Sequence, residues 1–221
     1  FFLTSKIPGC GVPGQGVDLL HCYADTKKLF QEDLDLLNVD YVDLMLIHFP
    51  PVLGCTLGCG AIQAQWKAME EMYNAKKARA IGVSNYCQSC FACLNKTMKV
   101  KPAVNQFQYH VGMGPDPIGL ISYCESQNIL VQAYSPLGNG SPELIHGNLT
   151  GSIGAKYNKT SVQIALKFVV QKGYGVLTKS TNPKYLADDI DLFDFNMTVS
   201  DMAKLDAATT PAGSPSFLCS S

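Results

Sequence analysis

The sequence predicts an α/β domain built on a parallel sheet, and two observations lead to that prediction. Short apolar runs rich in Val, Ile, Leu, Phe and Tyr alternate along the chain with amphipathic stretches. Successive strand–helix units of this kind are joined by right-handed crossovers, which make the sheet parallel. Because no Ser-, Pro- or Gly-rich linker interrupts the alternation, residues 1–221 are predicted to form a single domain.

Six strands are predicted, and most of them are short runs of β-branched, aliphatic or aromatic residues. They cover residues 1–5, 41–48, 80–84, 103–107, 129–134 and 175–179. Gly, Pro, Asn or Ser bounds most of these runs, as is typical of strands. Several lack polar alternation, which is expected where helices cover both faces of a parallel strand.

Helical patterns fill the gaps between the strands, at residues 26–37, 63–77, 118–127 and 161–171. In the last of these, Val162, Ala165 and Val169 recur on one helix face. Thr160 offers an N-cap before that face and Gly173 a stop after it. This order of elements fits both an open doubly wound sheet and a closed barrel, and composition does not separate the two.

Composition and charge argue against two classes of protein. With 17 Lys+Arg against 18 Asp+Glu and no basic block, the chain has little with which to neutralise a nucleic-acid backbone. Its apolar runs fall well short of the roughly 18 to 20 residues that span a bilayer. With 47% hydrophobic and 16% charged residues, the chain is long and apolar enough for a sizeable core.

The first residues do not predict a signal peptide. The chain opens on Phe1 and Phe2 without an initiator Met, a basic region or a small-residue cleavage site. We therefore expect the sequence to be the middle of something longer.

Nine cysteines are many for a cytosolic enzyme, and their spacing raises the question of a metal site. Cys87, Cys90 and Cys93 are spaced as on one helix face, while Cys55 and Cys59 lie in a separate loop. A zinc site requires a fourth ligand and tighter pairing than this pattern offers. We expect small buried residues and one or two disulfides instead, with no metal.

Five Asn-x-Ser/Thr sequons raise a second question about the compartment. They begin at Asn95, Asn139, Asn148, Asn158 and Asn196. The chain's Asn, Ser and Thr content would produce roughly one such match by chance. Polar loops that collect these residues and N-glycosylation in a secretory compartment both account for the excess, and both interpretations stay open.

One dinucleotide-binding motif is formally present and is set aside. Residues 9–14 match G-x-G-x-x-G after the first strand. However, Pro13 and further glycines extend a loop where the motif requires a helix N-terminus for the pyrophosphate. We expect a flexible loop here.

Polar or ionisable side chains stand at or just after the end of every predicted strand. In chain order they are Lys6, His48, Ser84 with Asn85, Asn105 with Gln106, Tyr134 with Ser135, and Lys179 with Ser180. The carboxyl ends of parallel strands meet at one rim, where both candidate architectures place their chemistry. The sequence therefore predicts that these groups converge on one site.

Several segments at and around these strand ends resemble the aldo-keto reductase family. They are residues 41–50 (YVDLMLIHFP), 66–70 (WKAME), 78–85 (ARAIGVSN), 101–106 (KPAVNQ) and 133–138 (AYSPLG). The resemblance runs from about residue 1 to 205 and implies a (β/α)8 TIM barrel. It makes the six predicted strands the third to the eighth of that barrel, with the first two missing from this chain.

The resemblance implies reduction of aldehydes or ketones to alcohols by hydride transfer from a nicotinamide cofactor. Of the family's Asp, Tyr, Lys and His tetrad, Lys6 and His48 are present, while the Asp and the general-acid Tyr would precede Phe1. Either a missing N-terminal segment or a partner chain would complete the barrel. The alternative is a catalytically inactive scaffold or a subunit of a larger assembly. The family also implies a cytoplasmic location, in contrast to the secretory location that the sequons and cysteines suggest.

The resemblance also assigns a binding role to most of the strand-end residues. Residues expected to bind the cofactor are Ser84, Asn85 and Gln106 at the carboxamide, Tyr134 stacked on the ring, Ser135 and Leu137 over the pyrophosphate, and Lys179 and Ser180 at the adenosine phosphate. Phe49 is expected to line an apolar substrate pocket. Tyr185 replaces the family's phosphate-gripping Arg, and Asp188 and Asp189 stand nearby, so either NADP or NAD is expected, with a weakened preference for the 2′-phosphate.

Overall fold

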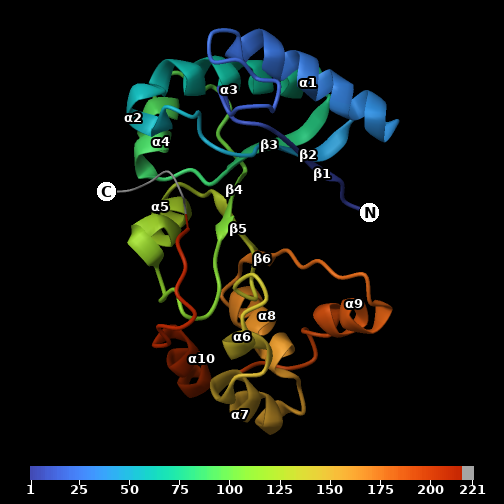
Figure 1. The fold of residues 1–221 in the computed structure, drawn as a ribbon, viewed down its shortest axis with the longest axis vertical. Helices are drawn as coiled ribbons and strands as arrows, with labels where there is room; N and C mark the ends of the chain where they lie inside the picture. Colours follow the sequence, from blue (N-terminus) through green and yellow to red (C-terminus); the bar gives the residue numbers. More distant parts are fainter. Residues whose placement is uncertain (216–221) are drawn as a thin grey trace. The chain divides into compact units, whose positions relative to one another are not determined.

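The computed structural model describes residues 1–215, so Cys219 lies outside the described part (Figure 1). The chain divides into two compact units. The first unit comprises Phe1–Gln106 and Ser126–Ile129, and the second comprises Phe107–Glu125 and Leu130–Pro215. Each is described separately below, and the prediction of one domain stays a prediction.

The strands follow one another in sequence order, β1-β2-β3-β4-β5-β6, in a six-stranded sheet. They are β1 (Thr4–Ile7), β2 (Val42–Ile47), β3 (Ala78–Ser84), β4 (Val104–Gln108), β5 (Leu130–Tyr134) and β6 (Gly175–Val176). The ladders β1–β2, β2–β3, β3–β4 and β5–β6 are all parallel. The predicted parallel α/β sheet is confirmed, and each strand starts or ends within a few residues of its expected position.

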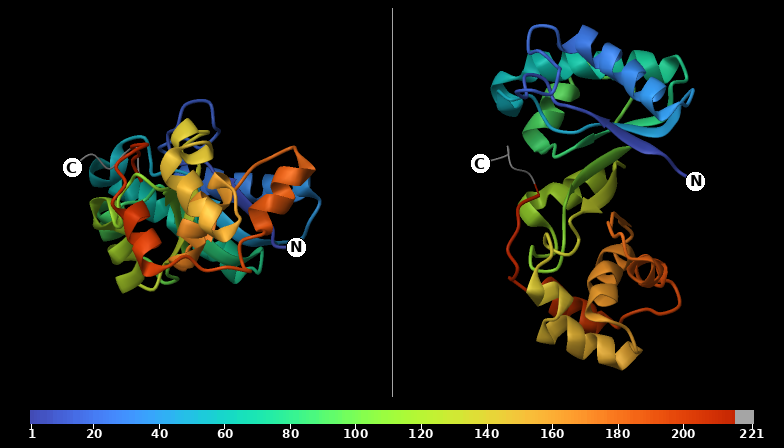
Figure 2. Two further views of the ribbon diagram at one scale, coloured as in Figure 1. Left: turned by 90° about the horizontal axis from the view of Figure 1, so that it is seen from below. Right: turned by 45° about the vertical axis from the view of Figure 1, so that its right-hand side comes forward.

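Within its described residues, the first unit contains four complete helices, of which the two longest pack against its strands. These helices are α1 (Cys22–Leu37), α2 (Gly54–Leu57), α3 (Cys59–Asn74) and α4 (Gln88–Leu94). Figures 1 and 2 show α1 and α3 side by side over these strands. The buried face of α1 repeats at Cys22, Thr26, Phe30 and Leu34, a spacing of one helical turn.

Strand β2 forms part of the hydrophobic core of this unit. Residues Leu44 to Ile47 are all buried. Trp66 of α3 is also buried, and its indole N–H donates to the carbonyl of Val100 at 2.9 Å. The apolar run therefore fixes the strand in place, and the polar residues that follow it emerge at its carboxyl end.

The second unit contains most of the remaining helices. They are the 3₁₀ turn η1 (Pro117–Gly119), α5 (Leu120–Ser126, of which Ser126 belongs to the first unit), α6 (Pro142–Ile145), α7 (Asn148–Tyr157), α8 (Ser161–Gln171), α9 (Pro183–Ile190) and α10 (Val199–Asp206). Helix α8 begins with a capping box, in which Thr160 and Gln163 satisfy each other's backbone N–H groups. Helix α10 is held to α7 because Lys156 and Tyr157 both bind Asp201, at 2.5 and 2.9 Å.

Among the described residues, no helix is both long and apolar enough to cross a membrane. Residues 8–21, which contain the G-x-G-x-x-G match, form a loop, and the next helix starts only at Cys22. The glycine motif therefore does not open a helix.

Candidate functional site

Lys6 lies near the carboxyl end of β1, where its backbone pairs in register with Leu46 of β2. Its ammonium donates a hydrogen bond to Oε1 of Gln106, which lies in β4. Partial burial lowers the pKa of Lys6 below its ordinary value of 10.5. A cation is thus held at the strand ends by an amide across the sheet.

His48 follows β2 directly and stands beside this cation. Its backbone N–H donates to the carbonyl of Ile7 at 2.8 Å, which extends the β1–β2 pairing by one step. Its ring stacks on Phe49 with centroids 4.3 Å apart. Burial, and secondarily the positive charge of Lys6, lower the pKa of His48 below 6.5, so the imidazole is neutral at pH 7.

The same site also contains Ser84, Asn85 and Gln106, and all three are buried. The Ser84 hydroxyl and the Asn85 backbone N–H donate to the Gln106 carbonyl at 2.7 and 2.8 Å. The Asn85 side-chain amide donates to the His48 carbonyl at 2.9 Å. Asn85 adopts a left-handed conformation with φ 61°, which Asn tolerates better than most residues. Residues at the ends of β2 and β3 are therefore joined by hydrogen bonds to each other and to Gln106 within β4.

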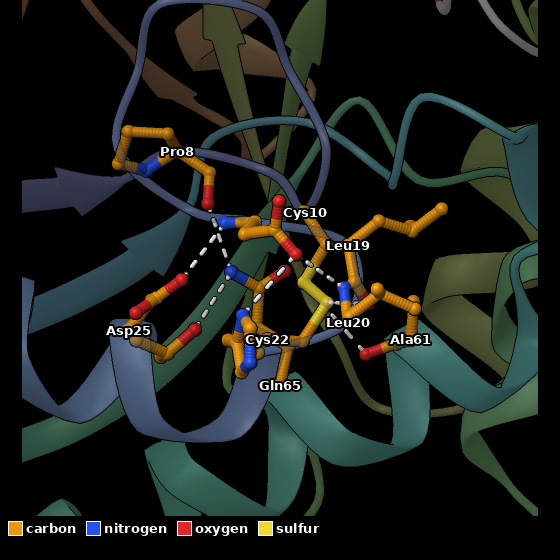
Figure 3. Close-up of a disulfide and its surroundings, with 11 residues drawn as sticks. Pro8, Cys10, Leu19, Leu20, Cys22, Asp25, Ala61 and Gln65 are labelled. Carbon is orange, nitrogen blue, oxygen red and sulfur yellow. Dashed lines mark hydrogen bonds and ion pairs between the residues drawn. A yellow bond between two sulfur atoms is a disulfide. The ribbon is translucent and has the colours of Figure 1, made fainter.

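The loop that follows Lys6 is fastened at several points, as Figure 3 shows. Cys10 in the loop is joined by a disulfide to Cys22, the first residue of α1. The Gln65 side chain from α3 donates to the carbonyl of Pro8 at 2.8 Å. Gly9 packs so closely on the next strand end that a β-carbon would lie 2.3 Å from the carbonyl oxygen of Phe49. The loop therefore stays against the segment that carries His48.

Two further disulfides, Cys55–Cys90 and Cys59–Cys93, join the segment after β2 to α4. Cys55, Cys87 and Cys90 bring their sulfur atoms within 4.8 Å of one another. The Cys55–Cys90 bond, however, takes up two of the thiolates that a metal ion would need. The described residues thus contain three disulfides, where the sequence led us to expect one or two.

The remaining predicted cofactor residues belong to the second unit. Tyr134 ends β5, and burial raises the pKa of its phenol to about 12. Ser135 follows with φ 48°, and its hydroxyl donates to Oδ1 of Asn139 at 2.7 Å. This bond closes the turn that carries Leu137.

A cavity of about 700 Å³ lies in the second unit, between the turn at Leu137, helices α7 and α8 and helix α9. It is lined by Leu137, Lys179 and Ser180, which were predicted to bind the cofactor, and by Tyr185, Asp188 and Asp189. Lys159 and Lys184 also line it and were not predicted as site residues. Lys184 pairs with Asp188 at 3.1 Å, and Lys159 pairs with Asp191 and Asp194 at 2.8 Å. The sequence does contain a signal for α9 and for Lys184. Asn182 and Pro183 are typical of a helix start, and Lys184 and Asp188 follow at the i,i+4 spacing of a helical ion pair.

The predicted site residues therefore fall into two groups. Lys6, His48, Phe49, Ser84, Asn85 and Gln106 lie together in the first unit, whereas Leu137, Lys179 and Ser180 share the cavity of the second. Tyr134 and Ser135 precede Leu137 on the same turn of the second unit.

The model of the aldo/keto reductase family matches residues 2–143 of this sequence, more than half of the chain. The chain belongs to the aldo/keto reductase family. A glyoxal reductase of Bacillus subtilis is 35% identical over 206 residues, covering 93% of this chain and 67% of the reductase. Two such curated relatives are longer than this chain, which spans 62% of the length of one and 67% of the length of the other.

Solved structures of aldo-keto reductases share the fold. MGS-M4, from a deep-sea metagenome library of the Medee basin, superposes with a TM-score of 0.84 at 28% identity, over all of this chain and 76% of that one. A point mutant of Gox0644 in complex with NADPH has a TM-score of 0.79 at 30% identity, over 93% of this chain and 69% of that one. The predicted fold class is confirmed: this aldo-keto reductase chain forms a parallel six-stranded α/β sheet, consistent with a TIM barrel that lacks some strands.

Proposed function

We propose that this aldo-keto reductase reduces aldehydes or ketones to alcohols with a nicotinamide cofactor, NADPH or NADH. The observation that supports the proposal best is the hydrogen-bonded group of Lys6, His48, Ser84, Asn85 and Gln106 at neighbouring strand ends. A packed interior gains nothing from a cation, an imidazole and several amides gathered in one place. Such groups can instead bind and polarise a carbonyl compound.

Each of these side chains has a distinct part in the proposed reaction. The His48 imidazole, neutral because its pKa is depressed, can donate a hydrogen bond to the substrate's carbonyl oxygen without carrying charge. The Lys6 ammonium stabilises negative charge that develops nearby and lowers the pKa of a neighbouring phenol. In this proposal the proton donor is a tyrosine outside residues 1–221, as the family pattern implies.

Each unit, taken by itself, carries groups that suit a nicotinamide dinucleotide. When bound, this cofactor supplies the hydride. A side-chain amide such as that of Gln106, whose Oε1 accepts the Lys6 hydrogen bond, matches the donor and acceptor groups of a nicotinamide carboxamide. In the second unit, the cavity of about 700 Å³ has the size of a small-molecule site, and its Lys179 and Ser180 can bind an adenosine phosphate.

The cavity of the second unit also supports the proposal that NADPH, which carries the 2′-phosphate, is bound only a little more tightly than NADH. Lys184 and Lys159 line the cavity, but carboxylates already neutralise both ammonium groups. Tyr185 cannot bind a phosphate in the bidentate manner of Arg. We therefore expect the dissociation constants for NADPH and NADH to differ by less than about tenfold, equivalent to about 1.4 kcal/mol.

The substrate is proposed to be an apolar carbonyl compound, because the Phe49 ring stacks on His48 beside the reacting groups. In Phe49→Ala, kcat/KM for an aromatic aldehyde should fall more than kcat/KM for a short aliphatic one. Equal losses for both aldehydes would remove Phe49 from the substrate pocket.

The proposal is tested with the whole protein by titrating NADPH and NADH and by following oxidation of the reduced cofactor in the presence of an aldehyde. In Lys6→Met, kcat should fall about 100-fold while the cofactor dissociation constant changes little. Lys96→Met, which removes an exposed lysine, is the matched control and should leave kcat unchanged. Cofactor binding without turnover in the unmodified protein would instead favour an inactive scaffold.

A further inference from the structure

We propose that the asparagines of the five sequons, Asn95, Asn139, Asn148, Asn158 and Asn196, carry N-linked glycans. The side-chain placement of these asparagines and the disulfides of the first unit each support this proposal independently. The proposal does not depend on the reductase activity.

All five asparagines are exposed, so the folded chain can carry a glycan at each of them. The modified atom is Nδ2, and in the described chain none of these five residues donates a hydrogen bond from it. By contrast, the buried Asn85 and Asn105 both donate from Nδ2 to backbone carbonyls, and neither lies in a sequon. The Nδ2 groups of the five sequon asparagines are therefore not used for hydrogen bonds within the described chain.

The local backbone presents each of these side chains at a turn or helix end. Asn95 caps the carboxyl end of α4, and Asn148 is the first residue of α7. Asn139 and Asn158 have φ of 57° and 54°, in the left-handed conformation that turn residues adopt. Asn196 precedes α10, which starts at Val199. None of the five asparagines therefore lies inside a strand or in the middle of a helix.

Asn139 shows that modification is compatible with the folded chain. Its Oδ1 accepts the Ser135 hydrogen bond at 2.7 Å. Glycosylation forms a bond between Nδ2 and the anomeric carbon of a lipid-linked oligosaccharide diphosphate. The bond from that carbon to the phosphate oxygen breaks, the lipid diphosphate leaves and one amide proton is lost. Because Oδ1 keeps its lone pairs, the turn after Tyr134 remains closed in the glycosylated protein.

The disulfides supply the second line of support. Cys10–Cys22, Cys55–Cys90 and Cys59–Cys93 have Cα separations of 5.6, 4.5 and 5.2 Å, which lie within the normal range for disulfides. Structural disulfides persist in oxidising compartments and are rare where glutathione keeps thiols reduced. The secretory pathway is the compartment in which disulfides and N-glycans form together.

The test uses the protein isolated from its own cells. Treatment with peptide N-glycosidase in heavy-oxygen water, followed by peptide mass spectrometry, should convert the five asparagines to aspartates that carry heavy oxygen. Asn38, Asn74, Asn128 and Asn182 are exposed but lie outside sequons, and they should stay unchanged. Unmodified asparagine at all five sequons before and after treatment would overturn the proposal, and a site found unmodified in both samples is withdrawn.

A matched pair of variants tests the sequon chemistry at one exposed site. Thr97→Ser preserves the Asn95 sequon and should keep the glycan, whereas Thr97→Ala destroys it and should lower the mass by one glycan. Both changes affect an exposed side chain in the turn after α4, so folding should be equal in the two variants. Equal masses for the two variants, apart from the single oxygen atom by which Ser and Ala differ, would contradict modification of Asn95.

Discussion

The charge of Lys6 affects the titration of His48, and both side chains are partly withdrawn from water at neighbouring strand ends. Burial disfavours the charged form of each group, and the ammonium adds a like charge beside the imidazole. The result is an imidazole that stays neutral where an exposed histidine would begin to titrate. Such a group can donate a hydrogen bond to a carbonyl oxygen throughout the neutral range.

This coupling predicts a measurable difference between two histidines. An NMR titration of the ring protons should place the pKa of His48 below 6.5, and Lys6→Met should raise that pKa because the second cause of its depression is gone. His110 is the internal control, because burial also lowers its pKa but Lys6 does not. An unchanged pKa of His48 in Lys6→Met would contradict the coupling.

The lowered pKa of His48 also determines the direction in which the free energy of unfolding changes with pH. Because the folded pKa of His48 lies below the unfolded one, the unfolded chain binds a proton first as the pH falls through 6.5. The His48 contribution to the free energy of unfolding therefore decreases from about pH 6.5 down to the folded pKa, and it is constant above that window.

Which residues stand at the strand ends could be predicted from the sequence, but their partners could not. His48 directly follows the apolar run of β2, and Lys6 lies one residue before the end of β1, so both stand near the rim. The hydrogen bond from Lys6 to Gln106 joins residues 100 positions apart, and no local pattern encodes it. The pairing of Cys55 with Cys90 is hidden for the same reason, because it depends on how α4 packs beside α2.

Among the elements, β3 is the one that depends most visibly on a single small residue. Gly82 lies in β3, and a β-carbon there would lie 2.7 Å from both Leu46 Cδ2 and the Val104 carbonyl oxygen. Strands β2 and β4 therefore approach β3 closely at this point. The glycine permits the contact that holds the strand ends of the candidate site in register.

Two glycine-to-alanine variants should accordingly shift stability in opposite directions. Gly82→Ala should lower the free energy of unfolding by about 1 to 3 kcal/mol, because a backbone oxygen cannot move aside. Gly60→Ala in α3 meets nothing within 4 Å and should raise it by up to about 1 kcal/mol. Urea denaturation of both variants measures the two effects, and a neutral Gly82→Ala would show that the strands can separate locally.

Helices with a clear apolar face were predictable, and those with mixed sequences were not. The predicted helix at residues 161–171 matches α8, because its apolar spacing and capping residues agree. Helix α7 contains Gly151 and Gly154, which weaken the helical pattern, and it forms through packing on α8. Helix α3 ends at Asn74 rather than residue 77, because Lys76 adopts a left-handed φ of 62°.

In the molecule as a whole, the described disulfides and the tryptophan are confined to one of the two units. All three disulfides of the described residues and the single tryptophan, Trp66, belong to the first unit. Disulfides stabilise a fold chiefly by restricting the unfolded chain, by about 3 kcal/mol for a loop like that between Cys10 and Cys22. Trp66 fluorescence therefore reports directly on the cross-linked part of the chain.

This distribution allows the single-domain prediction to be tested by chemical denaturation. Reduction and alkylation of the thiols should move the midpoint of the Trp66 transition to lower urea, while alkylation without reductant leaves the disulfides intact and serves as the control. If the chain is one cooperative domain, far-UV circular dichroism should report the same shifted midpoint, because helices of both units then unfold with Trp66. A second dichroism transition that reduction does not move would mean that the units unfold independently, and the single-domain prediction would be wrong. An unmoved Trp66 midpoint would mean that the disulfides add little to the stability of the first unit.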